Sequence, residues 1–116
     1  MTRDRLARAA GRSPARAKAA DLLRSGQPLY RGSLVQYSRR CGAAGCQCAQ
    51  GRLHRGWALS LSAAGKTQIV YLPDDLRPEL AAGLRRYKDL TALLERIARA
   101  DTRALRQRAR RYRKRQ

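Results

Sequence analysis

The chain has 116 residues, the size of one domain, and 27 Lys and Arg against 8 Asp and Glu give it a formal net charge of +19. It contains no apolar run of about 18 residues, which excludes a membrane-spanning helix, and its first segment lacks the continuous apolar region of a secretory signal. Such a charge favours phosphate-rich partners, above all nucleic acid, over an anionic membrane. We therefore expect a cytoplasmic protein with no membrane partner.

Residues 1–27 are predicted to form a basic arm and a short helix. Ser13 and Pro14 combine a typical N-cap residue with a proline at the first helical position, so we expect a helix over Ala15–Arg24. The predicted helix has only two large apolar residues and would be marginally stable alone. Residues 1–12 are accordingly expected to be a mobile arm.

Residues 28–73 are predicted to form a small antiparallel sheet of three strands, with a loop between the first and second. The first strand is expected over residues 32–38. Residues 57–62 alternate large apolar and small side chains with a period of two, which is typical of a strand with one buried face. Residues 67–72 are rich in strand-forming types, and the Gly-containing turn between these two segments makes them a hairpin.

Residues 74–116 are predicted to form one long helix with a basic tail. Asp74 or Asp75 is expected to cap it, and apolar residues recur at helical spacing from Leu76 to Ile97. We favour a face that covers the sheet and the first helix, although part of the pattern follows a heptad and a coiled-coil dimer is the alternative. The tail either continues the helix or frays. The fold class is therefore α+β, with a short N-terminal helix, a three-stranded antiparallel sheet with a zinc loop, and a long C-terminal helix.

Four potential metal ligands follow one another in the pattern C-x4-C-x-C-x5-H. They are Cys41, Cys46, Cys48 and His54. Thiolates and imidazole are the donors that tetrahedral zinc prefers, and the three glycines between them, Gly42, Gly45 and Gly51, permit the positive φ of a tight loop. Flanking arginines lower thiol pKa values and so favour the metal-binding thiolate. We expect one structural Zn²⁺.

Other interpretations of the cysteines are weaker. A Gly- and Ala-rich loop offers little core for cysteines to pack into, and no C-x2-C redox motif is present. Cys46 and Cys48 would form a strained disulfide. An iron–sulfur cluster and a His54 without a role remain the alternatives. Because all four ligands are used and residues 28–73 contain no Asp or Glu, we do not expect an enzyme.

A series of short motifs is spread over roughly residues 32–97. They are Gly32-Ser33-Leu34-Val35, Arg40-Cys41-Gly42, Cys46-Gln47-Cys48, Gly51, His54, Gly65-Lys66-Thr67, Tyr71-Leu72-Pro73 and Tyr87. In these motifs the chain resembles a bacterial family of small, basic, zinc-ribbon-like domains of unknown function that often lie near mobile elements. The resemblance implies the sheet, the zinc loop and the long helix, and it implies no activity.

The leading functional hypothesis is a zinc-stabilised nucleic-acid-binding accessory protein that contacts the backbone with weak sequence preference. The residues expected to form its patch are Arg31, Arg39, Arg40, Arg52, Arg55 and Lys66. Trp57 and Tyr37 would stack on bases if exposed. One alternative is a protein-interaction module whose long helix docks a partner such as a transposase or recombinase, or a second copy of itself. Another is a ribosome-associated zinc protein. The pattern suits DNA and RNA, and single and double strands, equally.

Overall fold

The first helix begins where the Ser-Pro pair predicts it. The computed structural model describes residues 13–40, 42, 43 and 45–115, so the arm expected over residues 1–12 lies outside the described part. Helix α2 spans Pro14–Arg24, and the Ser13 side chain accepts a hydrogen bond from the backbone N–H of Arg16 at 3.4 Å. At the other end the Ser25 hydroxyl donates to the Leu22 carbonyl at 2.7 Å. Local capping chemistry therefore sets both ends of this helix.

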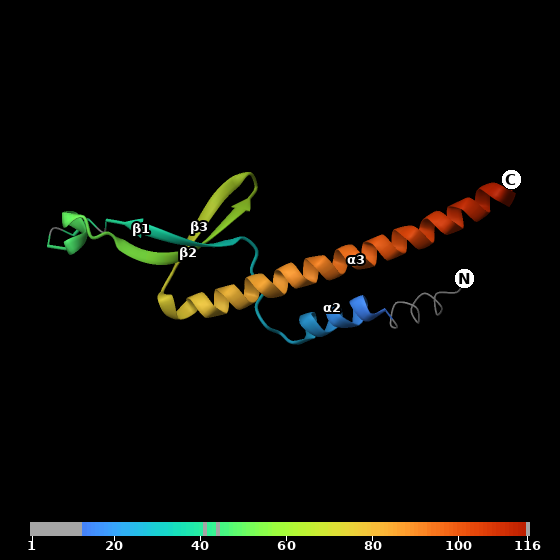
Figure 1. The fold of residues 1–116 in the computed structure, drawn as a ribbon, viewed down its shortest axis with the longest axis horizontal. Helices are drawn as coiled ribbons and strands as arrows, with labels where there is room; N and C mark the ends of the chain where they lie inside the picture. Colours follow the sequence, from blue (N-terminus) through green and yellow to red (C-terminus); the bar gives the residue numbers. More distant parts are fainter. Residues whose placement is uncertain (1–12, 41, 44, 116) are drawn as a thin grey trace. The chain divides into compact units, whose positions relative to one another are not determined.

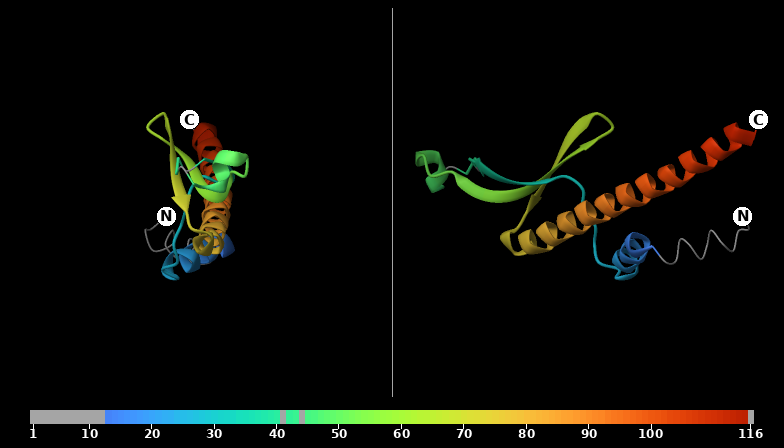
Figure 2. Two further views of the ribbon diagram at one scale, coloured as in Figure 1. Left: turned by 90° about the vertical axis from the view of Figure 1, so that its left-hand side faces the viewer. Right: turned by 45° about the vertical axis from the view of Figure 1, so that its right-hand side comes forward.

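The three predicted strands are present and pair in the order β1-β2-β3, all antiparallel (Figure 1). Strand β1 spans Ser33–Arg39, β2 spans His54–Ala63 and β3 spans Lys66–Leu72. The turn between β2 and β3 has two residues, Ala64 and Gly65, with φ values of 53° and 77°. Two positive φ values in a two-residue hairpin turn match the right-handed twist that β-strands adopt. Figure 2 shows that the β2–β3 hairpin is twisted.

Strand β2 is longer than expected, and its burial differs from the predicted pattern. It begins at His54, three residues before the predicted start, because Arg39 to Gln36 of β1 pair with His54 to Trp57. Its alternation predicted that the large side chains would be the buried ones. Instead Ala58 is only 1 % exposed, whereas Trp57 on the opposite face is half-buried. A methyl group in a central strand is covered more completely by its larger neighbours than an indole ring is.

The long helix is present and includes the basic tail. A 3₁₀ turn, η2, spans Asp74–Leu76, and α3 continues from it over Arg77–Arg115. The expected cap is wrong, because Pro73 occupies the N-cap position of η2 without a side-chain hydrogen bond, and both aspartates lie inside the first turn. Carboxylates there still interact favourably with the helix dipole. No helix among the described residues is long and apolar enough to span a membrane.

The chain divides into two units whose boundary falls within α3. Residues 1–27 and 88–116 form one unit, and residues 28–87 form the other. In the first, α2 lies against the middle of α3 (Figure 1) and buries a small apolar core. This core consists of Ala15, Ala19, Leu90 and Leu93, with Leu22 and Ile97 packed against it. A salt bridge between Arg16 and Asp101, 2.6 Å long, joins the same two helices.

In the second unit, the segment before β1 is tied to the first turns of α3. The backbone N–H of Tyr30 donates to the Gly83 carbonyl at 3.2 Å, and the Arg86 guanidinium donates to the Pro28 carbonyl at 2.8 Å. Gly83 is buried, and the Tyr30 ring occupies the space where a side chain at that position would lie. A residue without a side chain is therefore needed for this close approach.

Candidate metal loop and nucleic-acid interface

The loop between β1 and β2 brings two of the four predicted metal ligands together. Cys46 Sγ lies 3.1 Å from His54 Nε2. The antiparallel register explains the position of the imidazole, because His54 is the first residue of β2 and pairs with Arg39, the last residue of β1. Two ligands of a tetrahedral zinc ion lie about 3.5 Å apart, given Zn–S and Zn–N bonds of about 2.3 and 2.0 Å. The observed separation is about 0.4 Å shorter than this, so the two side chains touch each other and would move slightly apart to share one ion.

The other two predicted ligands are only partly within the described residues. Cys48 lies in the 3₁₀ turn η1, Gln47–Gln50, and its side chain is outside the described part, as is all of Cys41. Among the described residues, no three His, Cys, Asp or Glu gather at any point. Three thiolates and one imidazole form a donor set suited to Zn²⁺. The residues present thus fit a zinc ion chemically.

The expected role of the glycines in this loop holds for two of the three. Gly42 and Gly51 have φ values of 79° and 101°, whereas Gly45 has no positive φ. The loop closes with a bond from the Cys46 N–H to the Ala43 carbonyl at 3.2 Å. Left-handed backbone on both sides of this turn lets the chain reverse direction within a short span.

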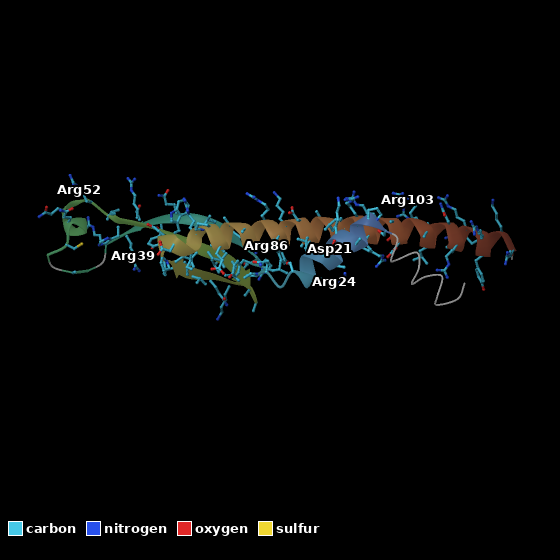
Figure 3. The ribbon with its side chains drawn as sticks, turned by 90° about the horizontal axis from the view of Figure 1, so that it is seen from below. Asp21, Arg24, Arg39, Arg52, Arg86 and Arg103 are labelled. Carbon is cyan, nitrogen blue, oxygen red and sulfur yellow. The ribbon has the colours of Figure 1, made fainter. Side chains whose placement is uncertain are left out.

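The six basic residues predicted for the patch fall at two ends of the sheet unit. Arg39, Arg40, Arg52 and Arg55 lie at or next to the loop end of β1 and β2, and all are exposed. Figure 3 labels Arg39 and Arg52 at this end. Arg31 lies at the hairpin end, where its guanidinium donates to the Ser62 carbonyl at 2.7 Å, and Lys66 begins β3 there. The structure thus groups four of the six residues around the loop between β1 and β2 and separates the other two.

An aromatic and cationic cluster lies across one face of the sheet beside the loop end. The rings of Tyr37 on β1 and Tyr71 on β3 meet edge to face, with centroids 4.9 Å apart. The Arg39 guanidinium lies 5.7 Å from the Tyr37 centroid and 5.0 Å from that of Tyr71. The two strands do not pair with each other, so the rings meet over β2, where Gly56 leaves room. A Cβ at Gly56 would lie 2.6 Å from the Tyr37 hydroxyl.

Trp57 lies on the opposite face and is covered. Its register partners are Gln36 and Leu72, so it projects from the other side of β2. The Arg77 guanidinium at the start of α3 lies 4.9 Å from its ring centroid. Tyr37 and Trp57 thus lie on different faces and cannot form one base-stacking surface. The sequence-based reasoning missed Tyr71, whose 55 % exposure and contact with Tyr37 depend on the pairing of β3.

The C-terminal half of α3 carries a row of exposed arginines that the predicted patch did not include. Their positions follow steps of three and four, which places them within about a third of the helix circumference. The row consists of Arg96, Arg99, Arg103, Arg106, Arg110 and Arg113, and Figure 3 labels Arg103 in it. Only Arg99 makes a salt bridge within the described part of the chain, to Glu95 at 3.0 Å. The heptad pattern predicted from the sequence concerned the apolar residues of this helix, and the predicted basic patch lay on residues 31–66.

Another side of the same half of α3 carries exposed apolar residues. Leu94, Leu105 and Tyr112 are 52 %, 60 % and 65 % exposed. Their spacing of eleven and seven residues places them on one face, away from the arginine row. The adjacent face is the one α2 covers through Leu90 and Leu93. The helix therefore presents a packed face, a cationic face and an open apolar face.

Comparison with known protein families found one match. The family model described as "Domain of unknown function (DUF6788)" matches residues 11–82, which include α2, the whole sheet, the metal loop and the first turns of α3. No curated protein and no solved structure matches the chain. The expectation of a domain family of unknown function is thereby confirmed.

Proposed function

Because the chain belongs to the DUF6788 family, whose function is unknown, its role has to be argued from its own residues, and we propose that it is a zinc-stabilised nucleic-acid-binding protein. In this proposal it contacts backbone phosphates and has weak sequence preference. Its role is binding and not catalysis, since residues 28–73 offer no carboxylate as a general base.

The arginine row on α3 carries this proposal. From Arg96 to Arg113 it extends about 26 Å along the helix, and Arg103, Arg106 and Arg110 form no salt bridge within the described part of the chain. A guanidinium without a carboxylate partner can bind phosphate without first breaking an ion pair. One cationic helix face with this spacing suits a line of phosphates better than a compact anion.

The basic loop end of the sheet is the second contact in the proposal. Four exposed arginines lie around the metal loop, in a segment of the chain with no acidic residue. Arginines whose neighbours include no carboxylate keep an uncompensated positive potential at short range. Phosphate contacts of this kind position the protein on nucleic acid without reading its bases.

Zinc has a structural role in this proposal. Cys41, Cys46, Cys48 and His54 would hold one ion, with all four protein ligands in place. The bound ion would supply folding free energy to a loop that has little apolar core of its own. It would thereby fix the end of β1 and the start of β2, on which Arg39 and Arg55 lie.

A salt series tests the proposal. The full chain with zinc is titrated into a fluorescent 20-base-pair duplex and anisotropy is measured at several salt concentrations. If about six phosphates are neutralised, log affinity falls with log salt with a slope near −5. No binding at low salt to this duplex or to a single-stranded oligo(dT), or affinity independent of salt, would refute the proposal.

Docking of a protein partner by α3 is the second candidate function. The exposed apolar face of Leu94, Leu105 and Tyr112 favours it, because apolar side chains spaced along one helix face are typical anchors of helix-in-groove binding. A Leu94→Asp, Leu105→Asp variant should then lose a partner that copurifies with the wild-type protein while keeping its salt-dependent affinity for DNA. If the variant keeps every copurifying protein, this candidate fails.

A further inference from the structure

We infer that the sheet face bearing Tyr37, Tyr71 and Arg39 is a stacking platform for a single-stranded polynucleotide. This inference rests on the proposed function and specifies its ligand, since a duplex keeps its bases stacked inside and offers no free base to a flat aromatic surface.

Two large side chains on this face of β3 are exposed to solvent. Tyr71 is 55 % exposed although it belongs to an apolar stretch of β3, and its neighbour two residues away on the same face, Ile69, is 47 % exposed. A tyrosine and an isoleucine left open side by side on a sheet lose the stabilisation that burial would give them. Flat apolar surface beside aromatic rings is what an unpaired base stacks on.

A positive charge lies over the two tyrosine rings of this face. The Arg39 guanidinium lies over both rings, 5.0 Å from the centroid of Tyr71. Arginine held beside an aromatic ring supplies a planar surface for a base and a positive charge for the adjoining phosphate. Arg40, also exposed, follows Arg39 directly at the loop end of the sheet, whereas Arg55 pairs with Ser38 and projects from the opposite face. Positive charge next to aromatic rings complements a polyanion whose bases are accessible.

Contacts within the sheet hold both tyrosine rings in place. Tyr37 lies where a side chain at Gly56 would be, so the ring rests low over the central strand. This contact, together with the edge-to-face contact with Tyr71, holds both rings in place before a ligand arrives. A base that stacks on a surface already ordered loses less conformational entropy on binding.

Tyr71→Ala and Tyr71→Phe variants of the full zinc-loaded chain test the inference, with oligo(dT) and a duplex as probes. Tyr71→Ala should weaken oligo(dT) binding at least about fivefold and leave duplex binding unchanged, since loss of a stacked aromatic costs this much or more per base. Tyr71→Phe should bind oligo(dT) like the wild type. Val70→Ala, which removes a 47 % exposed residue from the opposite face of the same strand, is the matched control and should change neither affinity.

Photo-crosslinking gives an independent readout. An oligonucleotide with 5-iodouracil reacts with an aromatic ring on which the base stacks, so the crosslinked peptide should contain Tyr71 or Tyr37. Crosslinks confined to other residues, or a Tyr71→Ala variant with unchanged oligo(dT) affinity, would overturn the platform while the proposed function stands. If neither oligo(dT) nor the duplex binds at low salt, the proposed function is instead overturned. Circular dichroism and zinc content of each variant confirm that the fold is retained.

Discussion

Cys46 Sγ lies 3.1 Å from His54 Nε2, and the two residues reach this distance from different elements. The cysteine precedes a 3₁₀ turn, whereas the histidine begins a β-strand whose register is set by Arg39 on the neighbouring strand. Strand pairing therefore sets the position of the imidazole, and the conformation of the loop brings the thiol next to it. A metal at this point would join the loop to the sheet.

We expect the purified protein to contain about one zinc per chain. Cys46→Ser and His54→Ala should each lower zinc affinity more than about a hundredfold, because changes beyond the first ligand shell already cost about 10- to 100-fold. Competition with a chromophoric chelator measures the affinity, and elemental analysis measures the content. Ser38→Ala, at an exposed position of β1, is the control. Wild-type zinc content far below one per chain would contradict the prediction.

Leu93 and Leu94 are adjacent on α3 but should differ greatly in their contribution to stability. Leu93 is 8 % exposed in the core against α2, whereas Leu94 is 52 % exposed. Leu93→Ala should lower the free energy of unfolding by about 2–3 kcal/mol through lost burial and an unfilled space. Leu94→Ala should change it by less than about 0.5 kcal/mol. Urea denaturation followed by circular dichroism measures both, and equal losses would place Leu94 in a buried interface.

Neutralising three residues of the α3 arginine row should change the salt dependence of DNA binding by a predictable amount. The triple variant Arg103→Gln, Arg106→Gln, Arg110→Gln removes up to three phosphate contacts, so the slope of log affinity against log salt should become shallower by about 2.7. Arg24→Gln removes a charge that already lies 3.9 Å from Asp21 and is the control, with little effect expected. An unchanged slope in the triple variant would place the contacts elsewhere.

Replacing Arg77 should change the fluorescence emission of Trp57, the only tryptophan in the chain. Its guanidinium lies 4.9 Å from the ring centroid, so Arg77→Ala uncovers a half-buried indole and should shift the emission to longer wavelength. The free energy of unfolding should fall by about 0.5–1 kcal/mol, typical of a cation–π contact near the surface. Arg85→Ala, an exposed arginine further along the same helix, should leave the emission unchanged.

Gly83→Ala should destabilise the protein although alanine is favoured over glycine in a helix by about 1 kcal/mol. The added methyl group would enter the space of the Tyr30 ring and lie 3.2 Å from the Pro28 carbonyl, an overpacking that costs about 1–3 kcal/mol. In a Tyr30→Ala background the same change should no longer destabilise. A double-mutant cycle by urea denaturation measures this coupling. Additive effects would show that Tyr30 does not limit the space at Gly83.

Local signals predicted the helix and strand elements well. Ser13 and Pro14 set the start of α2, and the Gly-containing turn placed the end of β2 and the start of β3 within one residue of their observed positions. The start of β2 was not predictable in this way, because residues 54–56 become a strand only by pairing with the end of β1. Their own composition, with an arginine and a glycine, carries no strand signal.

In the candidate sites, too, some contacts could be predicted from the sequence and others could not. The proximity of Cys46 and His54 could be expected from spacing alone, since they are only eight residues apart around one short loop. The contact of Tyr37 with Tyr71 could not, because it joins the two outer strands and depends on the register of both hairpins. Trp57 and Tyr37 seemed equivalent in the sequence, and strand alternation separates them onto opposite faces.

The contact between Tyr37 and Gly56 implies a constraint on how this family can vary. A side chain at position 56 and an aromatic ring at position 37 compete for the same space, so position 56 can gain a side chain only if the residue at position 37 becomes smaller. Among members of the family, substitutions at these two positions should therefore occur together, with a larger residue at 56 accompanied by a smaller one at 37. Members that keep both residues would also keep the ring that Tyr71 contacts.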